Sequence, residues 1–142
     1  MKRTILAGLA LAAALAAAAA SAGELSVTGA WSRSTPPGAK VGVVYFKIKN
    51  DTKKSDRLLK LSTPVAAGVE VHRTEVLDGI ARMREVAVLH VDAGQTLEFG
   101  PGGLHVMLTG VRRPLAAGTT FELEMLFEVA GPRKVRVEVR GP

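Results

Sequence analysis

Cysteine is absent from this chain of 142 residues. Its absence excludes a disulfide framework, a thiol nucleophile, a zinc or iron–sulfur site built on cysteine, and a type I copper centre, which needs a thiolate. Aromatic residues are also few: one tryptophan, one tyrosine and four phenylalanines. The basic residues are spread along the chain rather than gathered in a stripe. We therefore expect no nucleic-acid binding.

The one long hydrophobic run lies at the start of the chain. Among residues 1–22 there are 11 alanines, and Lys2 and Arg3 precede the apolar run from Ile5 to Ala20. A basic start, an apolar run and a small-residue exit are typical of a secretory signal peptide. We expect cleavage after about Ala22, no stable membrane insertion of the remaining chain, and one domain formed by residues 23–142. Without the two leading cations the basic count falls from 19 to 17, against 13 acidic residues.

The remaining chain has the two-residue periodicity of β-strands and no long stretch of helical periodicity. Turn residues such as Asp78-Gly79 and the Gly-Pro-Gly-Gly run at 100–103 separate the apolar runs. The pattern predicts an all-β fold, an antiparallel sandwich or barrel in a single domain. The predicted strands are 24–31, 41–49, 58–61, 69–76, 81–88, 96–99, 104–109, 121–129 and 135–139.

The strand predicted over 104–109 places a histidine beside a methionine. Strand alternation puts His105 and Met107 on one face and the apolar Leu104, Val106 and Leu108 on the other. The apolar trio is expected to face the core. Met107 therefore shares the opposite face with a histidine.

A second histidine and methionine come together in the predicted hairpin 69–88. If Asp78-Gly79 forms a two-residue turn, His72 lies opposite Glu85, and Met83 is its diagonal neighbour on the same face. Diagonal neighbours are within reach of long side chains. After the predicted signal peptide, one more methionine and one more histidine remain. Met125 alternates with apolar neighbours and is expected in the core, whereas His90 is expected to be a solvated or locally bonded loop residue.

Four residues, His72, Met83, His105 and Met107, are thus candidates for one site. The alternative is that both methionines pack in a second apolar layer while both histidines lie at the surface. Two imidazoles and two thioethers form a soft, uncharged ligand set that suits Cu(I) and excludes Mg²⁺ or Ca²⁺. Zinc remains possible through the histidines. No paired carboxylates or activated nucleophile accompany them, so we expect no enzymatic activity.

The spacing of these residues resembles the signature of the PCuAC family of periplasmic copper(I) chaperones. Ten residues separate His72 from Met83, 21 separate Met83 from His105, and one separates His105 from Met107. The segments 29–39, 44–50 and 102–108 are similar to that family as well, and the resemblance spans about residues 24–139.

The resemblance implies a cupredoxin-like Greek-key β-sandwich that binds one Cu(I) through His72, Met83, His105 and Met107 in the periplasm. It also implies delivery of copper to the copper-site subunit of cytochrome c oxidase, often beside a thioredoxin-like copper-insertion protein. We expect a monomer. Members often carry a methionine directly after the first histidine, where this chain has Arg73, and some carry a His- and Met-rich tail. No such tail precedes Pro142, so we expect no second copper site.

Other functions fit parts of this pattern. An exported copper buffer without a dedicated acceptor would use the same ligands. A metal-free β-sandwich adhesion or scaffold module would need none of them. A copper oxidase or monooxygenase is disfavoured, because turnover requires open coordination positions and harder ligands.

Overall fold

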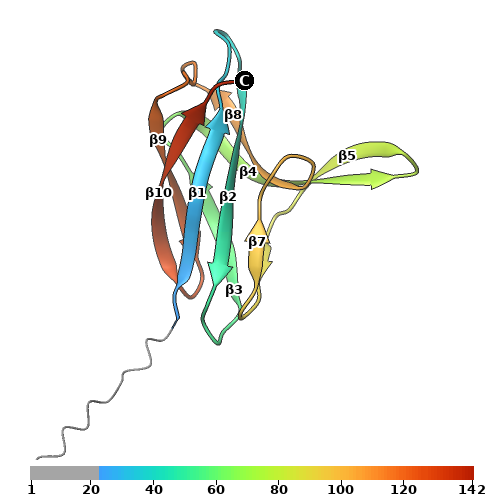
Figure 1. The fold of residues 1–142 in the computed structure, drawn as a ribbon, viewed down its shortest axis with the longest axis vertical. Coiled ribbons are helices and arrows are strands. Elements are labelled where there is room, and N and C mark those ends of the chain that lie inside the picture. Colours follow the sequence, from blue (N-terminus) through green and yellow to red (C-terminus); the bar gives the residue numbers. More distant parts are fainter. Residues whose placement is uncertain (1–22) are drawn as a thin grey trace, which may run out of the picture.

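A computed structural model describes residues 23–142 and shows ten β-strands, with no helix in that range (Figure 1). The predicted signal peptide, residues 1–22, lies outside the described residues. The strands are β1 (Leu25–Arg33), β2 (Val41–Asn50), β3 (Asp56–Ser62), β4 (Ala66–Leu77), β5 (Ile80–Glu85), β6 (Leu89–Val91), β7 (Thr96–Glu98), β8 (Leu104–Val111), β9 (Thr120–Phe127) and β10 (Gly131–Arg140).

Alternation of buried and exposed side chains is clearest in β9. In β9 the buried positions are Phe121, Leu123, Met125 and Phe127, and the residues between them are exposed. Met125 is 1% exposed, which confirms its predicted place in the core. The period-two pattern of the sequence is therefore the direct cause of the fold, because only one face of each strand can be buried.

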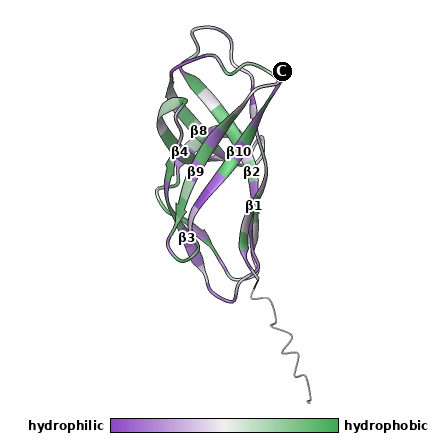
Figure 2. Ribbon diagram, turned by 90° about the vertical axis from the view of Figure 1, so that its left-hand side faces the viewer, coloured by the Kyte–Doolittle hydropathy of each residue, from purple (hydrophilic) through white to green (hydrophobic). Residues whose placement is uncertain are grey.

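All ten strands join one sheet. Nine of them follow the order β5-β4-β8-β2-β1-β10-β9-β3-β6, and β7 pairs with residues 47–49 of β2, whereas β8 pairs with residues 41–44 of the same strand. The sheet curls over, so that β9 and β10 form one layer and β4 and β8 another (Figures 1 and 2). Buried side chains from both layers, among them Leu123, Val137, Val71 and Val106, form one continuous hydrophobic core. A single sheet thus provides both layers of the predicted all-β fold.

The structure corrects the sequence predictions in three places. The pairing is antiparallel throughout except between β1 and β10, which are parallel. Strand β6 was missed because it has only three residues, and exposed His90 lies in it rather than in a loop. The strand predicted over 121–129 ends at Phe127, the turn to β10 occupies 128–130, and Gly131 opens β10 with a positive φ of 77°.

The β4–β5 hairpin has the predicted register. Asp78 and Gly79 form its two-residue turn with φ of 51° and 75°, as a type I′ turn requires, so Leu77 pairs with Ile80. His72 lies opposite Glu85, as predicted. The hairpin extends away from the rest of the sheet (Figure 1).

Residues 23–142 contain no helix that is long and apolar enough to cross a membrane.

Asp56 fastens β3 to the turn between β9 and β10. Its buried carboxylate accepts hydrogen bonds from the backbone N–H groups of Arg57 (2.7 Å), Val129 (2.9 Å) and Ala130 (2.8 Å). Burial by itself would raise the pKa of this carboxyl, but the backbone donors outweigh burial and hold the pKa below its ordinary value.

Asp56→Ala is expected to lower the free energy of unfolding by about 2–3 kcal/mol at pH 7, because the substitution leaves buried N–H groups without an acceptor. Since the folded-state pKa is depressed, the ionised carboxylate stabilises the fold above its unfolded-state pKa of about 4. That contribution is lost as the pH falls through the lower, folded-state pKa. Urea unfolding of the parent and of Asp56→Ala, measured from pH 7 to pH 3, should show that the difference between their free energies of unfolding becomes smaller as the pH falls.

The exposed Asp92, whose side chain makes no hydrogen bond within the described range, provides the control. Asp92→Ala should leave unfolding nearly unchanged. An equal loss in the free energy of unfolding in both variants would contradict the stabilising role of the Asp56 carboxylate.

Candidate metal centre

Strands β4 and β8 place the two predicted histidines side by side. His72 pairs directly with His105 in the antiparallel ladder, and their ring centroids lie 5.8 Å apart. The neighbouring pair, Val71 and Val106, is buried in the core. Because alternate residues point to opposite faces, both imidazoles project from the face of the sheet that lies away from the core.

Met107 joins the histidines on the same face. It lies two residues beyond His105 in β8 and opposite Glu70 in β4, so it is a diagonal neighbour of His72. Its side chain is half-buried, between Glu70 on one side and Val43 of β2 on the other. The alternation predicted for 104–109 is therefore present in the structure.

Met83 lies at the rim of this group. It pairs with Thr74 in the hairpin and is the predicted diagonal neighbour of His72. Met83 and Met107 lie on opposite sides of His72, however, and Met83 is 61% exposed. The structure thus brings His72, His105 and Met107 into one cluster and leaves Met83 beside it on the hairpin.

The backbone orients the ring of His105. Nδ1 of His105 lies 3.0 Å from the carbonyl oxygen of Gly103. A carbonyl only accepts hydrogen bonds, so Nδ1 carries the proton and donates it. The lone pair of Nε2 is therefore left available for a metal ion.

A carboxylate orients the ring of His72. Its Nε2 lies 2.8 Å from Oε2 of Glu70, so Nε2 donates to the ionised carboxylate and Nδ1 keeps its lone pair. That Nδ1 is buried and has no hydrogen-bond partner. An unpartnered buried acceptor is costly, and a bound ion would satisfy it. The geometry therefore gives both histidines one fixed nitrogen and one free nitrogen.

Glu70 was not identified from the sequence. Its position two residues before His72 on the same strand is the signal that could have identified it, because such residues share a face. The sequence interpretation considered only an uncharged ligand set. The structure adds the carboxylate of Glu70, which lies next to Nε2 of His72.

Among residues 23–142 no three His, Cys, Asp or Glu side chains gather closely enough to hold an ion. The donors that the strands do bring together are two imidazoles and the thioether of Met107. Such a set suits a soft ion such as Cu(I) better than the hard divalent cations. The arrangement can bind such an ion, but it offers no paired carboxylates for acid–base chemistry.

Comparison with known proteins identifies relatives over nearly the whole described range. A family model described as putative lipoprotein LpqE-like matches residues 25–139. A putative lipoprotein, Lxx21020 of Leifsonia xyli subsp. xyli (strain CTCB07), is 28% identical over 117 residues, which are 82% of this chain and 69% of that protein. The uncharacterized protein RP573 of Rickettsia prowazekii (strain Madrid E) is 30% identical over 97 residues. These residues are 68% of this chain and only 54%, about half, of RP573.

Solved structures share the fold. The copper-bound PCuAC domain from PmoF2 has a TM-score of 0.72 at 21% identity, over 85% of this chain and 96% of that domain. The Cu(I) form of DR1885 from Deinococcus radiodurans has a TM-score of 0.70 at 29% identity, over 87% and 83% of the two chains. The predicted cupredoxin-like all-β fold and the resemblance to PCuAC domains are thereby confirmed. The chain belongs to the LpqE-like family, the family of the PCuAC domains.

Proposed function

We propose that this protein is an exported copper chaperone that binds one Cu(I) through His72, Met83, His105 and Met107. The observation that carries the proposal is the pair of facing histidines, each with one nitrogen fixed and the other free, beside the sulfur of Met107. The similarity to copper-bound domains supports copper as the ion. Family membership fits a carrier rather than an enzyme.

The exposure of the ligands suits both retention and release. His105 is 6% exposed and Met107 is half-buried, so these two shield the ion from water. Met83 is largely exposed at the rim, where a ligand of another protein can replace it. Neutral ligands bind Cu(I) without surrounding it with several negative charges. Such a site can hold the ion and still exchange it.

The acceptor we propose is the copper-site subunit of cytochrome c oxidase in the periplasm, with a thioredoxin-like copper-insertion protein as a second partner. The PCuAC resemblance supports this choice of acceptor, and the match to a family and a relative described as putative lipoproteins supports an exported location. Buffering without a dedicated acceptor is the competing function.

Mixing the Cu(I)-loaded protein with the apo copper domain of the oxidase subunit distinguishes the two functions. Delivery predicts that the copper domain acquires its metal-dependent visible absorption after reoxidation. No transfer despite a favourable affinity gradient would indicate buffering.

One substitution test of this proposal concerns the copper ligands. His105→Ala and Met107→Ala should each weaken Cu(I) binding by at least the roughly 10–100-fold that is typical for loss of an outer-shell partner, because each removes a direct ligand. Competition with the Cu(I) chelator bathocuproine disulfonate measures the change. Met125→Leu, a conservative replacement of the core methionine, should bind copper like the parent. Parent-like binding by both ligand variants would refute the site.

A second substitution test concerns the carboxylate of Glu70. Glu70→Ala should weaken Cu(I) binding roughly tenfold, because the ring of His72 loses the group that fixes its orientation and tautomer. Glu70→Gln, which keeps an acceptor oxygen, should recover part of that loss. In ¹⁵N NMR spectra of the metal-free protein, His72 should be protonated at Nε2 in the parent and should lose that preference in Glu70→Ala.

Glu85 provides the matched control for Glu70. It lies opposite His72 on the other neighbouring strand, is exposed, and makes no hydrogen bond to the ring within the described residues. Glu85→Ala should leave both the affinity and the tautomer unchanged. An equal effect of the two substitutions would show that only general negative charge matters.

A further inference from the structure

Exposed apolar side chains gather on the β4–β5 hairpin. Val76 is 68% exposed, Met83 61%, Ile80 55% and Leu77 48%. Ala81, which pairs with Val76, is exposed as well. We call these five residues the hairpin patch. Leaving several apolar side chains together in water is unfavourable, and such patches mark surfaces that contact another molecule.

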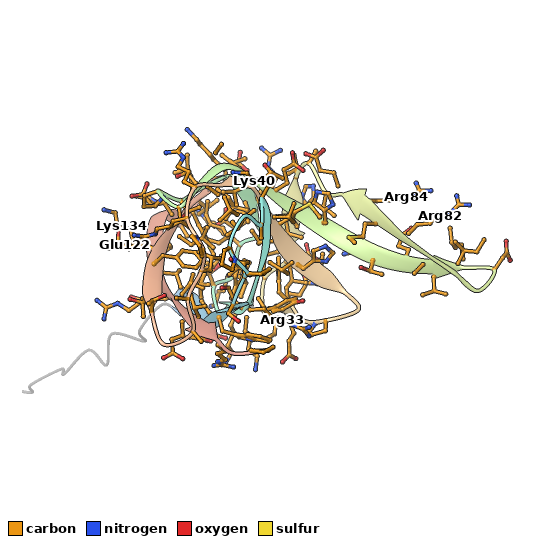
Figure 3. All side chains as sticks on the ribbon, turned by 90° about the horizontal axis from the view of Figure 1, so that it is seen from above. Arg33, Lys40, Arg82, Arg84, Glu122 and Lys134 are labelled. Carbon is orange, nitrogen blue, oxygen red and sulfur yellow. The ribbon has the colours of Figure 1, made fainter. Side chains whose placement is uncertain are left out.

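The outer part of the hairpin, beyond Arg73, pairs with no other strand of the described sheet on either side. The pairing of β4 with β8 ends at Arg73 and Leu104, so the hairpin beyond that pair has no further strand beside β4. On the other side, β5 is the edge strand of the sheet. The hairpin therefore projects from the body (Figures 1 and 3).

The two faces of the hairpin differ in chemistry. Register places Val76, Ala81 and Met83 on the same face as His72, so the apolar patch continues directly from the candidate metal centre. The opposite face carries Arg73, Glu75, Arg82 and Arg84 and, beside the turn, the apolar Leu77 and Ile80 of the patch. Figure 3 shows Arg82 and Arg84 pointing to the same side of the hairpin.

The opposite face has an excess of positive charge. Glu75 forms an ion pair with Arg84 at 3.6 Å. Arg73 and Arg82 have no carboxylate within 4.0 Å in the described part of the chain, and Arg73 lies directly opposite Arg84. Like charges at paired positions repel each other. A partner with acidic side chains would relieve this repulsion and pair with the free guanidinium groups.

We infer that the hairpin patch is the docking surface for the protein that accepts copper, and that the acceptor presents its copper site within an apolar surface with acidic residues at the rim. This inference rests on the proposed function. An apolar contact around Met83 would exclude water from the ion while the ligands exchange. Copper stays Cu(I) throughout: each bond to a ligand of this protein is replaced by a bond to a ligand of the acceptor, and no electron moves.

A protein partner explains the position of the patch better than a lipid surface does. The patch includes Met83, a candidate ligand, and adjoins His72. Docking there brings the ligands of a second protein to the ion. A membrane would cover the same residues without offering a ligand.

The test compares substitutions of exposed apolar residues inside and outside the hairpin patch. The double variant Val76→Ser, Ile80→Ser removes one exposed apolar side chain from each face of the hairpin and changes no candidate ligand. The control, Val129→Ser, changes a valine that is 57% exposed in the turn between β9 and β10. For each protein, stopped-flow measures Cu(I) transfer to the apo copper domain of the oxidase's copper-site subunit, and bathocuproine disulfonate competition measures Cu(I) affinity.

We expect the double variant to transfer copper about tenfold more slowly than the parent, because it lacks two of the exposed apolar side chains of the patch, while its affinity stays the same. Val129→Ser should match the parent in both measurements. Arg82→Glu should also slow transfer, most clearly at low salt, where attraction to an acidic partner is least screened.

Unchanged transfer by the double variant, with affinity intact, would overturn the docking surface and leave copper binding and delivery standing. Failure of the parent to bind Cu(I) would overturn the proposed function itself. Failure of the loaded parent to transfer copper would overturn both delivery to this acceptor and docking on it. Binding of the parent to phosphatidylglycerol vesicles that the double variant loses, without any change in transfer, would assign the patch to a lipid surface instead.

Discussion

The pairing of β4 with β8 is the constraint on which the site depends. It sets His72 opposite His105, although 32 residues separate them in the sequence. The register is fixed by the core, because Val71 and Val106 must face inward when the histidines face outward. A slip of one residue would turn the imidazoles toward the core and the valines away from it. The same apolar burial that stabilises the fold therefore assembles the candidate copper site.

Orientation of the ligands depends on groups just outside the cluster. The carbonyl oxygen of Gly103 holds His105 by Nδ1, and the carboxylate of Glu70 holds His72 by Nε2. The two rings thus offer different nitrogens to an ion. Fixing the rings before the metal arrives lowers the entropy cost of binding, while the exposed Met83 keeps one side of the site open to exchange. In the proposed site the fixed histidines would retain the copper ion, and the side at Met83 would allow its release.

Much of this arrangement could be predicted from the sequence, because it follows from local rules. The Asp78-Gly79 turn fixed the hairpin register, and strand alternation put His105 and Met107 on one face. Glu70, the parallel β1–β10 pair and the three-residue strand β6 were missed. The parallel pair depends on contact between distant segments, which period-two patterning does not specify, and β6 is too short to show a pattern. Glu70 does share a face with His72 by strand alternation, but its hydrogen bond to the ring is a side-chain contact that alternation alone does not give. The projection of the hairpin beyond Arg73 follows from where β8 begins, and no residue within the hairpin encodes it.

X-ray absorption at the copper edge of the Cu(I)-loaded protein reports which atoms bind the ion. Binding through the histidines and methionines predicts a first shell that contains both nitrogen and sulfur, at distances of about 2.0–2.3 Å. The sulfur contribution should decrease in Met107→Ala and stay unchanged in Met125→Leu. A first shell of nitrogen and oxygen alone would contradict the account.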